Sequence, residues 1–193
     1  MNIIERAKGI IMKPKEEWEK ISRENTSSSV VLINYLIPLA LIPAIASFIG
    51  YGLIGYGPFS AISFGIKYAI IHLVSIIGGA YLTAFIVDSL APGFNAEKNF
   101  NRAFALISFA YTPMLVAGIF NILPALAVIA LLAGLYGLYI LYLGIKPMMK
   151  APDDKVTVYF IVSLLILIVT YIVISRILIS IFVGSLVRAA AGF

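Results

Sequence analysis

Two long stretches of this chain contain no charged residue, namely residues 25–66 and residues 103–145. One membrane crossing by a helix needs about 20 mostly apolar residues, so each stretch is long enough for two crossings. Glycines and a proline interrupt the first stretch at residues 50–58, and Asn121 and Pro124 divide the second, since such residues break helices. The pattern predicts a chain that crosses a membrane several times.

The composition excludes most soluble functions. Hydrophobic residues make up 62% of the 193 residues, charged residues 12%, and the mean hydropathy is +1.04, whereas soluble domains average about 45–50% apolar and about 25% charged residues. A soluble enzyme, a nucleic-acid-binding module and a disordered chain are therefore excluded. With no cysteine and one histidine, disulfide scaffolds, thiol nucleophiles and Cys or His-pair metal sites are excluded too. We expect no metal and no cofactor.

We therefore predict an all-α, polytopic bundle of five transmembrane helices preceded by an amphipathic segment. Residues 1–29 form the N-terminal segment and residues 30–193 the transmembrane domain. The spans are expected at about residues 30–49, 68–87, 103–120, 124–145 and 156–176. Pro113 lies inside the third predicted span and should kink it. Residues 177–187 are too few to cross again, so they either prolong the last helix or lie at the interface.

The N-terminal segment is charged and carries the only tryptophan, Trp18. It lacks the apolar core and cleavage site of a signal peptide. Apolar residues recur at helical spacing on both sides of Pro14, which predicts a break near Lys13 and a new helix from Pro14. Such a segment either lies at the membrane interface or packs on the cytoplasmic ends of the bundle, and the two are compatible.

Lysine and arginine predict the orientation. Of the 14 basic residues, only Lys67, Arg176 and Arg188 fall on one predicted side of the membrane. The positive-inside rule therefore places the N-terminus in the cytoplasm and the C-terminus outside. This clustering at the ends of apolar runs also explains the net charge of +5 without nucleic acid.

Four ionisable residues at or near the spans are candidates for function: Lys67, His72, Asp88 and Arg176. Ionisable groups inside a membrane are functional by default. Lys67 and Asp88 bracket the second span at about 31 Å apart, so they should lie at opposite surfaces. His72 lies about one to two turns below the outer surface. Each also has a purely structural interpretation, as a hydrogen-bonded histidine or as a charge at the membrane boundary.

A stripe of small residues, Ser75, Gly79 and Thr83, recurs every four residues on the second span. Small residues let transmembrane helices approach closely. The stripe predicts packing within the bundle or, alternatively, a homo-oligomer.

Three stretches together carry a resemblance to a known family. Pro14 and Trp18 form a Pro-x-x-x-Trp pattern before the first span. Residues 93–104 are GFNAEKNFNRAF and residues 110–113 are AYTP. Residues 135–155 form an aromatic, glycine-containing helix and a short loop with Pro152 and Lys155. In order and spacing the chain resembles the YIP domain family, the Ypt/Rab-interacting membrane proteins and their prokaryotic relatives.

The resemblance covers nearly the whole chain and implies five spans with a cytosolic N-terminus. For eukaryotic members it implies Golgi and endoplasmic reticulum trafficking, binding of prenylated small GTPases, and membrane shaping. The chain is similar to the short prokaryotic type, which implies a multi-pass protein of the plasma membrane. For that type the family implies no established reaction.

Two functions remain. The first is a non-enzymatic membrane-organising or partner-binding adaptor, in which Trp18 and the loop lysines Lys146, Lys150 and Lys155 meet anionic lipid headgroups or a protein at the inner face. The alternative is a small transporter or channel for an ion or small solute, built around Lys67 and His72. An intramembrane enzyme is not expected, because no nucleophile has a base nearby.

Overall fold

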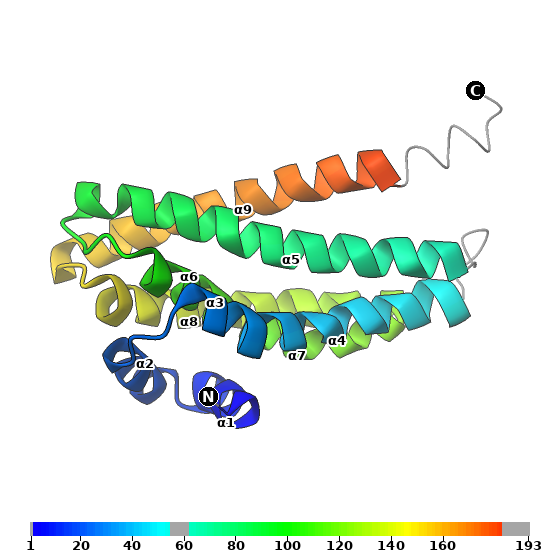
Figure 1. The fold of residues 1–193 in the computed structure, drawn as a ribbon, viewed down its shortest axis with the longest axis horizontal. Coiled ribbons are helices and arrows are strands. Elements are labelled where there is room, and N and C mark those ends of the chain that lie inside the picture. Colours follow the sequence, from blue (N-terminus) through cyan, green and yellow to red (C-terminus); the bar gives the residue numbers. More distant parts are fainter. Residues whose placement is uncertain (1, 55–61, 183–193) are drawn as a thin grey trace.

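The computed structural model describes residues 2–54 and 62–182, and this part of the chain consists of helices joined by short connections, with no strand. Long antiparallel helices lie side by side, and a short helical hairpin lies against one face of the bundle (Figure 1). Five segments are long and apolar enough to cross a membrane: Ser28–Ile54, Ile62–Phe94, Phe100–Ile122, Val128–Met149 and Asp153–Leu178. The predicted all-α bundle of five spans is confirmed.

The first span contains two π-helical turns. It begins with α3 (Ser28–Val31), capped by the Ser27 side chain. A π-turn at Leu32–Leu36 leads into α4 (Ile37–Phe48), and a second at Ile49–Ile54 ends the described part of the span. The first π-turn comes just before Pro38, which has no N–H for the carbonyl four residues earlier.

The second span is α5 (Ile62–Leu90), which continues into a 3-10 turn at Ala91–Phe94. Lys67 and Asp88 lie near its opposite ends, as predicted from their spacing. The turn ends at Asn95 in the left-handed conformation, φ 55°, which asparagine tolerates better than most residues.

The third span is broken in the middle. Helix α6 (Phe100–Ala110) ends at Tyr111, α7 (Thr112–Ala117) restarts with Pro113 in its first turn, and a 3-10 turn follows at Gly118–Ile122. The predicted kink is confirmed, because proline fits the first turn of a helix but not its interior. This span is the core of the bundle, since 67% of its apolar 18-residue stretch is buried.

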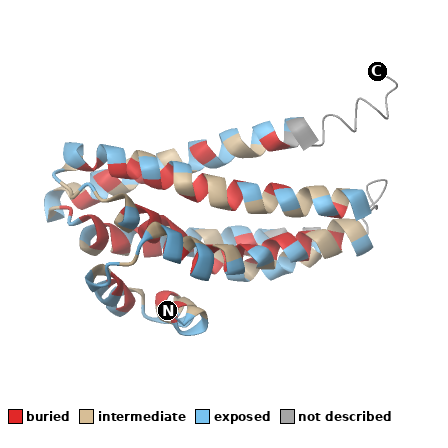
Figure 2. Ribbon diagram, viewed as in Figure 1, coloured by how far each residue is buried: buried red, intermediate tan, exposed pale blue. Residues whose placement is uncertain are grey.

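The last two spans form a hairpin. After a 3-10 turn at Pro124–Leu126, α8 runs over Ala127–Met149 and α9 over Asp153–Phe182. Helix α9 therefore continues beyond residue 176, one of the two alternatives expected from the sequence. Only 17% of the apolar 18-residue stretch of the fifth span is buried, and Figure 2 colours much of α9 as exposed or intermediate. The apolar surface of α9 is therefore available to lipid.

Several glycines mark close helix contacts. A Cβ on Gly137 would lie 2.6 Å from the carbonyl oxygen of Ala110, and one on Gly65 would lie 2.7 Å from the backbone of α4. Ser75, Gly79 and Thr83 are buried on α5. A Cβ on Gly79 would meet nothing nearer than the Tyr111 hydroxyl at 3.9 Å. Among the described residues, the closest helix–helix contacts are therefore at Gly65 and Gly137 and not at the stripe of Ser75, Gly79 and Thr83.

Candidate functional site: the α1–α2 hairpin and the basic end

Helices α1 (Ile3–Met12) and α2 (Pro14–Arg23) form a hairpin whose local sequence explains both helices. The Asn2 side chain caps α1, and Pro14 begins α2, which confirms the predicted break. Acidic residues occupy the first turn of α2 and basic residues the last, the arrangement that the helix dipole favours. Both helices pack on the bundle, α2 against α8 and α1 against α6 and α7.

Trp18 anchors α2 to the bundle. Its side chain is 1% exposed, its Nε1 donates to the Ile140 carbonyl at 2.9 Å, and its ring meets Phe109 edge-on. Gly144 makes room for the indole, because a Cβ there would lie 2.6 Å from the Trp18 ring. The structure thus has the segment packed on the bundle, with Trp18 turned inward, and its contact with the membrane interface stays a prediction.

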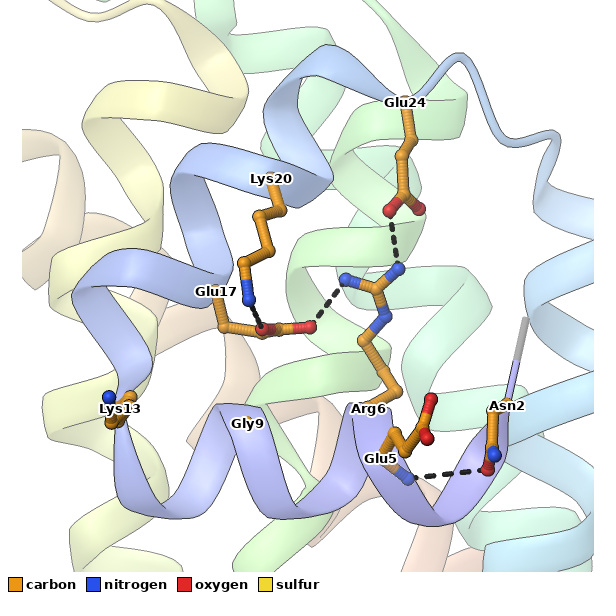
Figure 3. Close-up of a pocket in the computed structure, with 8 residues that line it drawn as sticks. All are labelled: Asn2, Glu5, Arg6, Gly9, Lys13, Glu17, Lys20 and Glu24. Carbon is orange, nitrogen blue, oxygen red and sulfur yellow. Dashed lines mark hydrogen bonds and ion pairs between the residues drawn. The ribbon is translucent and has the colours of Figure 1, made fainter.

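A buried ionic network joins α1 to α2 (Figure 3). The Arg6 guanidinium lies 2.7 Å from a Glu17 oxygen and 2.5 Å from a Glu24 oxygen, and Lys20 lies 3.1 Å from Glu17. The Arg6 and Glu17 side chains are 10% and 9% exposed. Gly9 leaves space for the Glu17 carboxylate, which would otherwise meet a Cβ at 2.6 Å. Since a buried charge without its partner is costly, this network holds the two helices at a fixed angle.

Sequence reasoning missed this network. Arg6, Glu17 and Glu24 were counted only as members of a charged segment. The available signal was that Arg6 and Glu17 fall among the apolar residues that face inward, Ile10 on α1 and Trp18 on α2. The pairing itself spans a helix break, so no helical spacing predicts it.

Further hydrogen bonds tie the hairpin to the spans. Tyr136 donates through its hydroxyl to the Ile11 carbonyl at 2.7 Å. Arg102 donates to the Ser22 carbonyl at 3.2 Å and to the Met148 carbonyl at 3.4 Å. Arg102 is thus directed to backbone carbonyls, and no ion pair joins it to Asp88 among the described residues.

Two grooves flank α1. A polar groove of about 420 Å³ lies between α1 and α2, lined by Asn2, Glu5, Arg6, Gly9, Lys13, Glu17, Lys20 and Glu24. An apolar groove of about 460 Å³ lies on the side of α1 that faces α4 and α7. It is lined by Ile3, Ile4, Ala7, Lys8, Ile11, Met12, Pro38, Leu39, Ile42 and Val116. One helix thus separates a charged surface from an apolar one.

The predicted loop lysines lie together at one end of the bundle, here called the basic end and defined by Lys98, Arg102, Lys146, Lys150 and Lys155. Each loop lysine has an acidic neighbour: Lys146 lies 2.5 Å from Asp153, Lys155 lies 4.0 Å from Asp154, and Lys150 pairs with Glu97. A hydrogen bond from the Lys150 ammonium lowers the pKa of the Glu97 carboxyl. The Lys150–Glu97 pair joins the segments that follow α5 and α8, whereas the other two pairs lie at the connection between α8 and α9.

The predicted intramembrane candidates do not come together. Lys67 and Asp88 lie at opposite ends of α5, and Arg176 is exposed on α9. His72 is half-buried on α5. Asp88 is 6% exposed, and its Oδ1 has no hydrogen-bond partner among the described residues. These positions do not converge on one site, unlike the hairpin residues.

The described residues contain no group of three or more side chains that could hold a metal ion. Comparisons with curated proteins and with solved structures gave no match. A family model described as the Yip1 domain matches residues 8–175. This match includes α2, the first four spans, most of the fifth and the basic end, and the chain is therefore a membrane protein of the Yip1 domain family.

Proposed function

We propose that this protein is a non-enzymatic adaptor of the plasma membrane of a prokaryote, and that the α1–α2 hairpin and the basic end form its partner-binding surface. The basic end faces the cytoplasm, because lysine and arginine concentrate there. The observation that carries the proposal is the fixed docking of the hairpin through Trp18 and the Arg6 network.

A docked hairpin presents a preorganised surface. Its anchor and its ionic network are turned inward, while Lys15, Glu19 and Arg23 of α2 are exposed. Preorganisation lowers the entropy cost of binding, and charges at the rim of an interface favour correct partners. Lys98 is also exposed at this end. The pattern of both signs favours a protein partner over an anionic lipid surface alone, which would select positive charge only.

The proposal is tested by site-specific photo-cross-linking in native membranes. A photoreactive residue at Glu19 should give a discrete protein adduct, whereas one at Val169 on the lipid-exposed face of α9 should give lipid adducts. The identified protein, once purified, should bind the reconstituted wild type and lose affinity for the Arg23→Glu variant. Lipid adducts alone at Glu19, or equal binding by the variant, would contradict the adaptor role.

Transport is the second candidate, and one observation favours it. Asp88 is a buried carboxyl group near the basic end of α5, close to Tyr159, whose hydroxyl donates to the Val87 carbonyl at 2.8 Å. Buried carboxyl groups in membranes often mark ion or proton pathways. Flux of protons or cations into liposomes that Asp88→Asn abolishes would support transport, and a wild type without flux would rule it out for these ions.

A further inference from the structure

Helix α1 contacts the middle of three spans. The Ile11 carbonyl accepts from Tyr136, which lies well inside the fourth span, and the Arg6 guanidinium lies 5.7 Å from the Phe109 ring centroid in the third. The apolar groove beside α1 is lined by Ile42 of the first span and Val116 of the third. The hairpin therefore lies along the side of the bundle rather than on its tip.

Helix α1 also runs across the bundle helices, as Figure 3 shows, and it is seen nearly end-on in Figure 1. Its outer face carries the exposed charges Glu5 and Lys8 between the exposed apolar side chains Ile4 and Met12, and the exposed Lys13 follows at its end. A helix with this pattern lies in the plane of the interface, because exposed charges in the hydrocarbon are costly. On this face, the surface of the bilayer must be level with α1.

On this face, the apolar part of the bundle between α1 and the end of the spans opposite the basic end is short. From Tyr136 to Ala127, the first residue of α8, the helix rises about 14 Å at 1.5 Å per residue. The 3-10 turn Pro124–Leu126, whose residues are all apolar, adds about 6 Å at 2.0 Å per residue. A typical hydrocarbon core is about 30 Å thick, so this face covers only about two thirds of it.

The opposite face, formed by α5 and α9, is long enough to require the full thickness of the hydrocarbon core. The stretch from Lys67 to Asp88 on α5 contains no charge and is about 31 Å long. Gly79 lies beside the Tyr111 hydroxyl. Because Tyr111 lies between Phe109 and Val116, the residues of the third span that α1 approaches, Gly79 marks the level of α1 on α5. Phe85, six residues nearer the basic end and so about 9 Å further along, is still 61% exposed and apolar. Hydrocarbon must reach past the level of α1 on this face.

We propose that the protein holds a step in the surrounding bilayer: beside α1 and α2 the headgroups of the basic-end leaflet are drawn toward the midplane, and beside α5 and α9 they are not. The partner of this surface is the lipid bilayer itself, and the acyl chains of the thinned region fill the apolar groove under Ile4 and Met12. The proposal does not depend on the adaptor role, since it follows from the heights of the two faces.

A spin-label experiment tests the step. The chain has no cysteine, so single nitroxides can be placed at Lys13→Cys, at the end of α1, and at Phe85→Cys on α5 as the control; the native side chains are 68% and 61% exposed. In phosphatidylcholine vesicles, the label at residue 13 should be several-fold more accessible to a water-soluble nickel chelate than the label at residue 85. Trp18 emission in the same samples reports whether the hairpin is docked.

Each outcome decides the question. Two labels protected from nickel but accessible to oxygen would mean that α1 is immersed in hydrocarbon without a step. Two labels equally accessible to nickel would mean that the bilayer has one level around the protein. Red-shifted Trp18 emission would mean that the hairpin leaves the bundle in a bilayer. All three would overturn the proposal. Tryptic cleavage of α2 should also rise several-fold from short-chain to long-chain lipid, because a thicker bilayer opposes the step, and an unchanged rate would contradict it.

Discussion

Replacing Trp18 by alanine should release the hairpin from the bundle. The side chain is 1% exposed and donates to the Ile140 carbonyl. Truncating a buried tryptophan costs about 3–5 kcal/mol, and the lost hydrogen bond adds about 1 kcal/mol. The lower end of this range applies if the freed part of α2 settles in the bilayer interface. The free energy of hairpin opening should therefore fall by about 3–6 kcal/mol.

Limited trypsin digestion measures this opening, because Lys20 has an exposed side chain, 66%, but lies on α2, which must open before cleavage. At tenfold per 1.4 kcal/mol, the cleavage rate should rise by about two to four orders of magnitude, up to the rate of an open chain. The matched variant Trp18→Phe keeps an aromatic ring near Phe109 and should change the rate far less. Amide hydrogen exchange should show the same loss of protection in α2.

A Trp18→Ala protein whose cleavage rate stays within about tenfold of the wild type would refute the reasoning. It would mean that the hairpin is held by its ionic network or by lipid rather than by the tryptophan. Cleavage within the spans, by contrast, would mean that the variant fails to fold, and the milder Trp18→Phe comparison would then decide.

Three further predictions concern the same region. Gly144→Val should expose α2 to trypsin much as Trp18→Ala does, since the added side chain would enter the space of the indole; unchanged protection would disprove the close contact. Arg6→Met should destabilise hairpin docking by up to about 3 kcal/mol, because the buried Glu17 then keeps only the exposed Lys20 as its partner, whereas Arg6→Met combined with Glu17→Leu should recover much of the loss in tryptic protection. The pKa of Glu97 is lowered in the folded protein. The contribution of Glu97 to thermal stability is therefore present above its ordinary pKa and is lost as the pH falls through the pKa of the folded state. Glu97→Gln should flatten this dependence of the melting temperature on acid pH, and an unchanged pH profile would exclude the role of the Lys150 pair.

The sequence determined the architecture because hydrophobic length and helix breakers act locally. Charge-free runs require a membrane, the rise per residue sets how long a span must be, and Pro14 and Pro113 dictate where helices restart. The observed spans overlap all five expected ones and extend beyond several of them, because helical backbone continues past the apolar stretch. Family membership also followed from the order and spacing of short patterns, and the match over residues 8–175 confirms it.

The tertiary structure decided what the charged N-terminal residues do. The pairing of Arg6 with Glu17 and Glu24 spans the turn between two helices, and the hydrogen bond from Trp18 reaches a carbonyl 122 positions away. No local pattern encodes such contacts, because they depend on how α2 docks on α8. The level of α1 along the bundle is of the same kind. An amphipathic helix carries its interfacial preference in its own sequence, but only packing fixes the depth at which that helix meets the membrane.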